Sequence, residues 1–342
     1  MCRLLGLTAG REPISASFWL LDAPDSLEVQ SRRNADGSGI GFFDSAGTPV
    51  LDKQPEAAFR DQEFTREAKH ARSPVFVAHV RWASVGGRTL QNTHPFAMQG
   101  RIMAHNGGLG EVGRLAELLG PYRRLVQGET DSEHYFALIT QQIDAHGGNV
   151  GAGIAAAARW IADRLPVSSL NTVIAAPGEL WALRYPGQHA LHIIERPAGV
   201  SLPAGAASGG GGGGTASGGA ASGSGTASGG LASGGLASGG AASGGGTATG
   251  DAAPGGTASG GAAAPAGLHV RSATSSVHAP ALQGLPSVVV ASEELDGERG
   301  WRMLASGELV HVRPDLTVES AVVLPDPPAH LVPLPAGPNI DT

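Results

Sequence analysis

The chain has 342 residues, of which 41% are hydrophobic, and its formal net charge at neutral pH is −7. This charge, together with the lack of a basic cluster, argues against nucleic acid and anionic membranes as main partners. The sequence contains no signal-like amino terminus, no membrane-spanning apolar run and a single cysteine, so we expect a cytoplasmic protein.

Apolar patterning predicts a mixture of short strands and helices. In chain order we expect a strand over 2–9, a helical segment over 14–32 broken at Pro24, strands over 37–44 and 49–54, a helix over 61–72, strands over 73–84 and 100–107, a helix over 108–120, two helices over 128–144 and 153–165, three strands within 171–196, and closing strands within 287–295 and 307–324. The helix over 128–144 begins with a capping box, in which Thr130 precedes Glu133 by three residues.

This order predicts an α+β fold with two packed antiparallel sheets and the helices outside. An alternating Rossmann fold fits poorly, because helices do not separate successive strands and no phosphate-binding loop is present. Gly, Ala, Ser and Thr make up almost all of residues 204–267, which we expect to form a disordered tether; a fibrous glycine-rich repeat is the alternative. We therefore expect one domain built from 1–203 and 268–325, with a Pro-rich tail over 326–342.

The only cysteine, Cys2, directly follows the initiator methionine. It is either a small apolar residue in the first strand or a nucleophile that becomes the first residue when Met1 is removed. In the second case its α-amine, with an ordinary pKa of about 8, is a usable base next to the thiol. The sequence offers no GxSxG motif as an alternative nucleophile.

Three short stretches offer the charges and donors that acyl transfer needs. In HVRWAS, Arg81 can bind a carboxylate or be a surface residue at a strand end. In AHNGGLG, Asn106 and Gly107 can form an oxyanion hole or an ordinary Asn-Gly turn. In GETDSE, Asp131 can receive an ammonium group or merely complement a helix dipole.

Taken in order, Cys2, RNADGSGIG, HVRWAS, NTHPF, HNG and GETDSE resemble the class-II glutamine amidotransferases, which are N-terminal-nucleophile hydrolases. The resemblance is strongest to stand-alone bacterial members that begin MCRLLG or MCELLG. It covers about residues 2–200 and, more weakly, the stretch from VVVASEEL to GWRMLASGELV.

This resemblance implies a four-layer α-β-β-α fold and hydrolysis of glutamine to glutamate and ammonia, with no cofactor. It makes Cys2 the nucleophile and the Cys2 α-amine the general base. Arg81 would bind the substrate α-carboxylate and Asp131 its α-ammonium group. Asn106 and Gly107 would stabilise the oxyanion.

Four further residues receive supporting roles from the same resemblance. Trp82 would line the pocket, although a core aromatic is an equal alternative. His94 is expected to fix its loop rather than to transfer protons. Arg33 and Asp36 would support the surroundings of the nucleophile.

The sequence departs from related enzymes at two positions. Val85 stands where members with a synthase domain often have His, and Asn34 stands where they often have Gly. Ordering of the loop that covers the glutamine can therefore differ in this chain.

Three functions remain open at this point. One is a glutaminase-type enzyme, with a separate ammonia-accepting enzyme as a possible partner. Another is a γ-glutamyl hydrolase acting on a specialised metabolite, as in ergothioneine synthesis, and the third is a silent glutamyl-binding module. Metal-dependent hydrolysis is disfavoured, since the twelve histidines show no HExxH or other compact ligand spacing.

Overall fold

The computed structural model describes residues 2–83, 86–198, 268–271, 276–279 and 285–333. The low-complexity segment 204–267, expected to be a tether, lies outside the described residues. The parts of the chain on either side of that segment belong to one compact unit.

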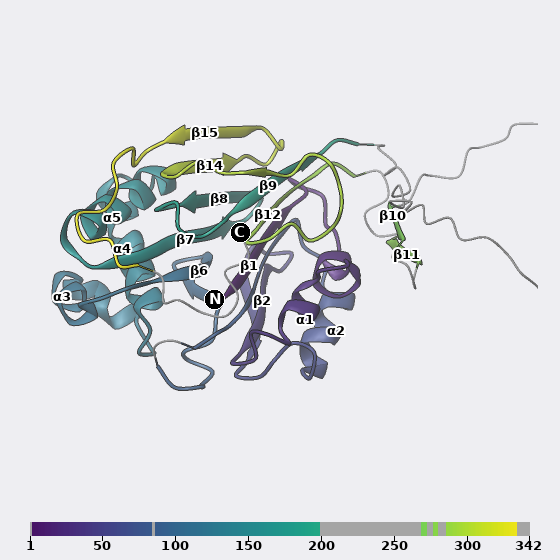
Figure 1. The fold of residues 1–342 in the computed structure, drawn as a ribbon, viewed down its shortest axis with the longest axis horizontal. Coiled ribbons are helices and arrows are strands. Elements are labelled where there is room, and N and C mark those ends of the chain that lie inside the picture. The colour runs from purple at the N-terminus through teal and green to yellow at the C-terminus, as the bar shows by residue number, and fades with distance from the viewer. Residues whose placement is uncertain (1, 84–85, 199–267, 272–275, 280–284, 334–342) are drawn as a thin grey trace, which may run out of the picture. The chain divides into compact units, whose positions relative to one another are not determined.

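Most described strands belong to two antiparallel sheets (Figure 1). The first sheet has the spatial order β13 (Arg302–Met303), β9 (His192–Arg196), β12 (Ser287–Ala291), β1 (Arg3–Thr8), β4 (Val75–Val80), β2 (Ser38–Phe43) and β3 (Pro49–Gln54). The second has the order β15 (Val318–Val322), β14 (Glu308–Val312), β8 (Glu179–Arg184), β7 (Val167–Ala176), β6 (Arg101–Leu109) and β5 (Phe96–Met98). Two short strands, β10 (Leu268–Arg271) and β11 (Ser276–Ala279), pair with each other.

Alternation along the strands decides what each side chain meets. In β4, Val75 and Val77 pack in a cluster shared with residues of the second sheet. The intervening Phe76 and Ala78 pack in a different cluster with the helices of the first sheet. The same alternation in β1 puts Leu4 between the sheets, and Cys2 lies two residues earlier on the same face.

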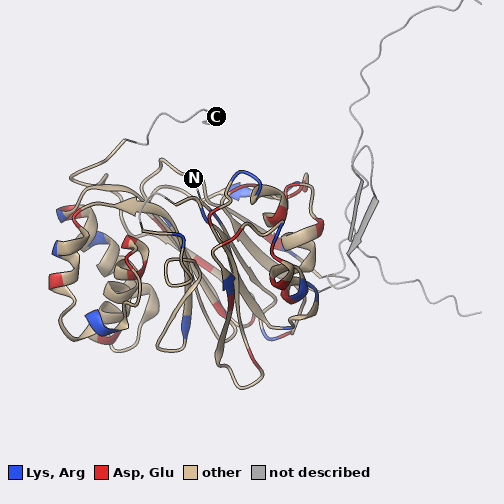
Figure 2. Ribbon diagram, turned by 90° about the horizontal axis from the view of Figure 1, so that it is seen from below, with Lys and Arg blue, Asp and Glu red and all other residues tan. Residues whose placement is uncertain are grey.

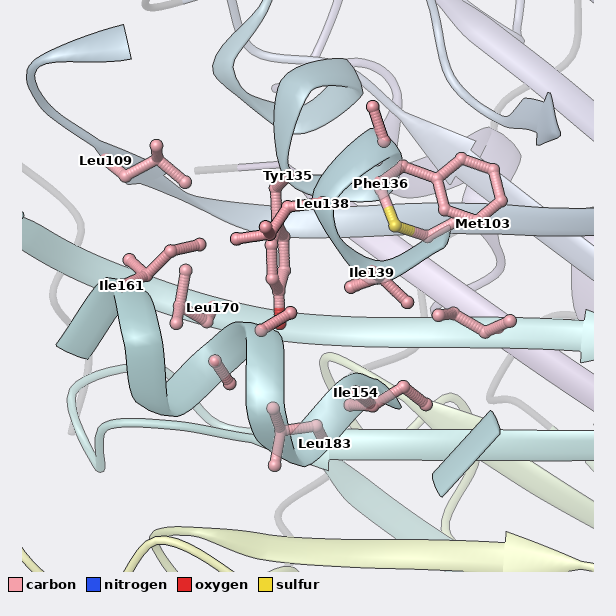
Figure 3. Packing of buried hydrophobic residues seen from close by; sticks show 14 of the residues in the cluster. Met103, Leu109, Tyr135, Phe136, Leu138, Ile139, Ile154, Ile161, Leu170 and Leu183 are labelled. Carbon is pink, nitrogen blue, oxygen red and sulfur yellow. The ribbon is translucent and has the colours of Figure 1, made fainter. Parts of the chain in front are cut away.

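Helices cover the outer face of each sheet, giving four layers. The first sheet carries a π-helical turn (Phe18–Asp22), α1 (Leu27–Gln30) and α2 (Gln62–His70). The second carries α3 (Val112–Leu118), a 3-10 helix (Gly120–Leu125), α4 (Asp131–Ala145) and α5 (Val150–Arg164). Figure 3 shows the packing of α4 and α5 on the second sheet, with Tyr135 and Leu138 close to Ile161 and Leu170. The predicted α-β-β-α sandwich is confirmed.

Local signals in the sequence explain several helix starts. Asp61 caps α2 by accepting hydrogen bonds from the main-chain N–H groups of Glu63 and Phe64, at 3.0 and 3.2 Å. Thr130 caps α4, with its hydroxyl 3.3 Å from the Glu133 nitrogen. A capping box also has the Glu133 carboxylate accept from the Thr130 N–H, and this part of the prediction is wrong. The carboxylate accepts instead from the N–H groups of residues 127 and 128.

Two element predictions need correction. The expected helical segment over 14–32 is only a π-helical turn and the four-residue α1, separated by Pro24. Strands β5, β10, β11 and β13 were not predicted, since runs this short carry little periodicity.

The long connection between β9 and β12 joins neighbouring strands. These strands are antiparallel, and Arg196 lies opposite Ser287, so the chain leaves the sheet and re-enters it at paired positions. A short hairpin loop could span the same gap.

Basic and acidic residues are interspersed over helices, strands and loops (Figure 2). Among the described residues, no helix has the length and apolar character needed to cross a bilayer.

Candidate active site

The site forms where the start of β1 meets the end of β4. These strands pair with Arg3 opposite Val80, which brings Cys2 beside the residues that follow β4. The Trp82 N–H donates to the Cys2 sulfur at 3.3 Å, and the thiol is 3.4 Å from the Trp82 carbonyl oxygen, which accepts from it. Both main-chain polar groups of Trp82 therefore hold the thiol.

The environment of Cys2 favours a neutral thiol. Burial raises the pKa of the Cys2 thiol, and this effect outweighs the hydrogen bond from Trp82 and the charge of Arg81, which lower it. The charge of Asp131 raises it further. Because the reactive form is the thiolate, attack by Cys2 requires a base that removes the proton.

Arg81 is buried, with 3% of its surface exposed, so the alternative of a surface arginine is wrong. Its guanidinium donates to the carbonyl oxygens of Gly87 and Gly86 at 3.1 and 3.3 Å. Burial lowers the pKa of Arg81, opposed chiefly by the nearby groups of Cys2 and Asp36. A buried cation therefore stands beside the thiol.

Asp131 is the first residue of α4 and is almost fully buried. Its Oδ2 accepts from the Leu109 N–H at 2.9 Å, and its Oδ1 accepts from the Ser132 N–H at 2.9 Å. The carboxylate therefore joins the end of β6 to the start of α4. Each carboxylate oxygen can accept more than one hydrogen bond, which leaves capacity for a ligand.

Asn106 and Gly107 lie inside strand β6, where they pair with Asn171 and Leu170, so the alternative of an Asn-Gly turn is wrong. A Cβ atom on Gly107 would stand 2.0 Å from the Ser169 carbonyl oxygen, and only glycine fits there. The buried Asn106 side chain lies on the same face of β6 as Ile102 and Ala104, which pack against the first sheet. Cys2 lies on the face of the first sheet that is turned toward β6.

Trp82 and His94 have opposite surroundings. The Trp82 side chain is 54% exposed, so the alternative of a core aromatic is wrong. His94 is buried, and its ring stacks on His79 with centroids 4.2 Å apart. Burial lowers the pKa of His94 well below its usual value, which makes it a neutral packing residue at physiological pH.

The two supporting residues also differ. Arg33 is exposed just after α1. Asp36 accepts from the Ala83 N–H at 2.8 Å and forms an ion pair with Arg88, so it holds the segment that follows Trp82. Asn34, one of the two positions where the sequence departs from related enzymes, is buried, and its side chain donates to the Gln30 carbonyl oxygen of α1 at 3.2 Å. The other position, Val85, lies outside the described residues.

Two site residues were missed by sequence reasoning. Asn92 donates to the Gly87 oxygen at 3.2 Å and accepts from the Glu129 N–H at 2.8 Å, joining the loop at Arg81 to the segment before α4. Ser292 has its hydroxyl 3.4 Å from the Asn106 amide nitrogen. Ser292 lies in VVVASEEL, which the sequence marked only as a strand; a buried serine at the end of an apolar strand is the available signal.

Within the described ranges, no group of three or more His, Cys, Asp or Glu side chains could hold a metal ion. The chemistry of this site rests on one thiol, one buried cation, one buried carboxylate and one buried amide.

Residues 1–200 match the family model for class-II glutamine amidotransferases, and the chain belongs to this family. A probable glutamine amidotransferase of Saccharomyces cerevisiae is 32% identical over 168 residues, which cover 43% of this chain and 47% of that protein. A gamma-glutamyl-hercynylcysteine sulfoxide hydrolase of Mycobacterium tuberculosis is 38% identical over 117 residues, covering 31% of this chain and 49% of that protein. The chain thus spans about half the length of these curated relatives.

Solved structures agree on the fold. The structure of the allosteric regulatory enzyme of purine biosynthesis matches 95% of this chain and 50% of its own, with a TM-score of 0.56 and 16% identity. A glutamine aminotransferase class-II domain protein from Silicibacter pomeroyi matches 94% of this chain and 99% of its own, with a TM-score of 0.50 and 16% identity.

Proposed function

We propose that this protein hydrolyses the γ-amide of glutamine or of a γ-glutamyl compound through a thioester on Cys2. The observation that carries the proposal is that the chain's one thiol contacts the main chain of Trp82, directly after the buried cation of Arg81. The charges of Arg81 and of the buried Asp131 both act on the pKa of this thiol. A glutamyl group carries a carboxylate and an ammonium group that complement these two side chains.

The reaction balances with the groups of this chain and water. Once Met1 has been removed, the Cys2 α-amine takes the thiol proton while the sulfur attacks the γ-carbonyl carbon. The oxyanion meets the Asn106 amide and the Gly107 N–H. The intermediate then collapses, the C–N bond breaks, and the leaving amine or ammonia takes the proton from the α-amine.

Water completes the cycle. It attacks the thioester carbon with the α-amine again as base, and the C–S bond breaks to release the γ-carboxylate and restore the thiol. A raised thiol pKa fits this mechanism, because the proton then stays on sulfur until the amine removes it in the reaction. In the glutaminase form, a separate enzyme would take up the ammonia.

A second candidate is a hydrolase specific for a γ-glutamyl amide of a larger metabolite. The relative that favours it is the 38% identical gamma-glutamyl-hercynylcysteine sulfoxide hydrolase. The chemistry at Cys2 is the same, and only the leaving amine differs. A silent glutamyl-binding module would not require the thiol.

The decisive experiment changes the amino terminus and no side chain. Protein with a free Cys2 amine should hydrolyse glutamine or at least one member of a panel of γ-glutamyl amides. An uncleaved amino-terminal tag should abolish the activity, because an amide nitrogen is not a base, whereas the same tag at the carboxyl terminus should leave it unchanged.

Mass spectrometry should show the mature chain beginning at Cys2, and a glutamine-like diazoketone should label that thiol with one equivalent. Full activity with Met1 or a tag retained would eliminate the α-amine as base. Absence of activity on the whole panel would favour the binding module.

A further inference from the structure

We propose that Ser292 is a positioning residue that aims the Asn106 amide at the oxyanion, so that the chain beyond the low-complexity segment completes the active site. This inference rests on the proposed function. Ser292 directly follows β12 and is 5% exposed. Its hydroxyl contacts both β1, the strand that directly follows the nucleophile, and β6, the strand that carries the proposed oxyanion donor.

The contacts of Ser292 with the first strand are made by both its main chain and its side chain. Its hydroxyl oxygen accepts from the Leu4 N–H at 3.1 Å, and its own N–H donates to the Leu4 carbonyl oxygen at 3.1 Å. Leu4 lies two residues after Cys2. Ser292 is therefore fixed relative to the nucleophile.

The same hydroxyl oxygen accepts from the Asn106 side-chain nitrogen at 3.4 Å. An amide nitrogen carries two hydrogens in a fixed plane. With one hydrogen directed at Ser292, the plane is set and the second hydrogen is the one that meets the oxyanion. The hydroxyl thereby couples the positions of thiol and donor across the two sheets.

The next residue strengthens this connection. Glu293 forms an ion pair with Arg3, and the Arg3 guanidinium donates to the Cys2 carbonyl oxygen at 3.2 Å. Two consecutive residues after β12 thus contact Cys2, Arg3 and Leu4, directly or through one side chain.

The expected signature is a loss in kcat without a matching change in KM. The oxyanion exists only after attack, so an interaction that aims its donor acts on the transition state more than on bound substrate. We expect Ser292→Ala to lower kcat about tenfold, less than the roughly 10²- to 10³-fold cost of removing an oxyanion donor outright. KM should change less than about twofold, since Arg81 and Asp131 are untouched.

Ser73→Ala is the matched control. Ser73 lies just before β4 and is also buried, and its hydroxyl accepts from the Phe43 N–H at 3.2 Å, yet it has no contact with Asn106 among the described hydrogen bonds. Both variants should lose thermal stability, whereas only Ser292→Ala should lose kcat.

A double-variant cycle isolates the route of the effect. In an Asn106→Ala background, Ser292→Ala should lower kcat no further, because the group that it positions is gone. Ser292→Thr, which keeps the hydroxyl, should retain kcat within about threefold of the parent, and it decides the matter if Ser292→Ala does not fold.

Any of four results would overturn the assignment of Ser292: an unchanged kcat in Ser292→Ala, an equal loss of kcat in Ser73→Ala, fully additive kcat losses with Asn106→Ala, or a tenfold loss of kcat in Ser292→Thr. In each case, activity of the parent protein would leave the proposed function intact. A parent protein inactive on every γ-glutamyl amide would overturn both.

Discussion

The stacked histidines behind the site should make the fold sensitive to acid. His79 lies in β4, on the face between the sheets, and its ring stacks on that of His94. Burial, assisted by the nearby charges of His105 and Arg81, lowers the pKa of His79 from 6.5 to about 3. Burial lowers the pKa of His94 in the same direction.

The sign follows from the protons bound in each state. Between the folded pKa of about 3 and the unfolded value of 6.5, the unfolded chain binds a proton at His79 that the folded chain does not. The free energy of unfolding therefore has its full value above the unfolded pKa and decreases as the pH falls below it. At pH 5, 1.5 units below the unfolded pKa of 6.5, the loss is about 2 kcal/mol for His79 alone.

Urea unfolding at pH 7.5 and pH 5.0 tests this value. Replacing His79 with Phe keeps a ring against His94 and removes the titrating group, so the drop in unfolding free energy between the two pH values should shrink by about 2 kcal/mol. The control is His70→Gln, at an exposed position at the end of α2, which should retain the full drop. Equal drops in the parent and in His79→Phe would refute the reasoning.

Three further predictions concern binding, packing and the insertion. Replacing Arg81 or Asp131 by Ala should raise KM about tenfold to a hundredfold with a smaller effect on kcat, since each charge-assisted contact is worth roughly 1.5–3 kcal/mol; unchanged steady-state kinetics would place the glutamyl charges elsewhere. Gly107→Ala should lower the unfolding free energy by about 1–3 kcal/mol, because its Cβ would stand 2.0 Å from the Ser169 oxygen, and an unchanged urea midpoint would contradict the packing. Replacing residues 204–267 with a short Gly-Ser linker should leave melting temperature and activity nearly unchanged, because β9 and β12 are paired neighbours; a large loss of either would assign the segment a role.

The sequence by itself determined the nature of the layers and the identity of the reacting groups. Short apolar runs predicted the strands, and their mixed order of strands, central helices and further strands predicted two packed antiparallel sheets. A lone cysteine at the second position, followed by HVRWAS, HNG and GETDSE in order, selected Cys2, Arg81, Asn106 and Asp131 as candidates. These signals are local, so they survive without knowledge of which strands pair.

Tertiary structure alone decided which interpretation of each local motif holds. Asn-Gly in isolation is a turn, but pairing with β7 keeps Asn106 and Gly107 inside a strand. Arg81 at a strand end could face solvent, yet the carbonyls of Gly86 and Gly87 enclose it.

Ser292 is the clearest case, because it meets Asn106 across a separation of 186 residues and the junction of two sheets. Periodicity reports which face of an element is apolar. It does not report which distant strands pair or which side chains meet between the sheets, because a period of two fixes the buried face of a strand and not its partner.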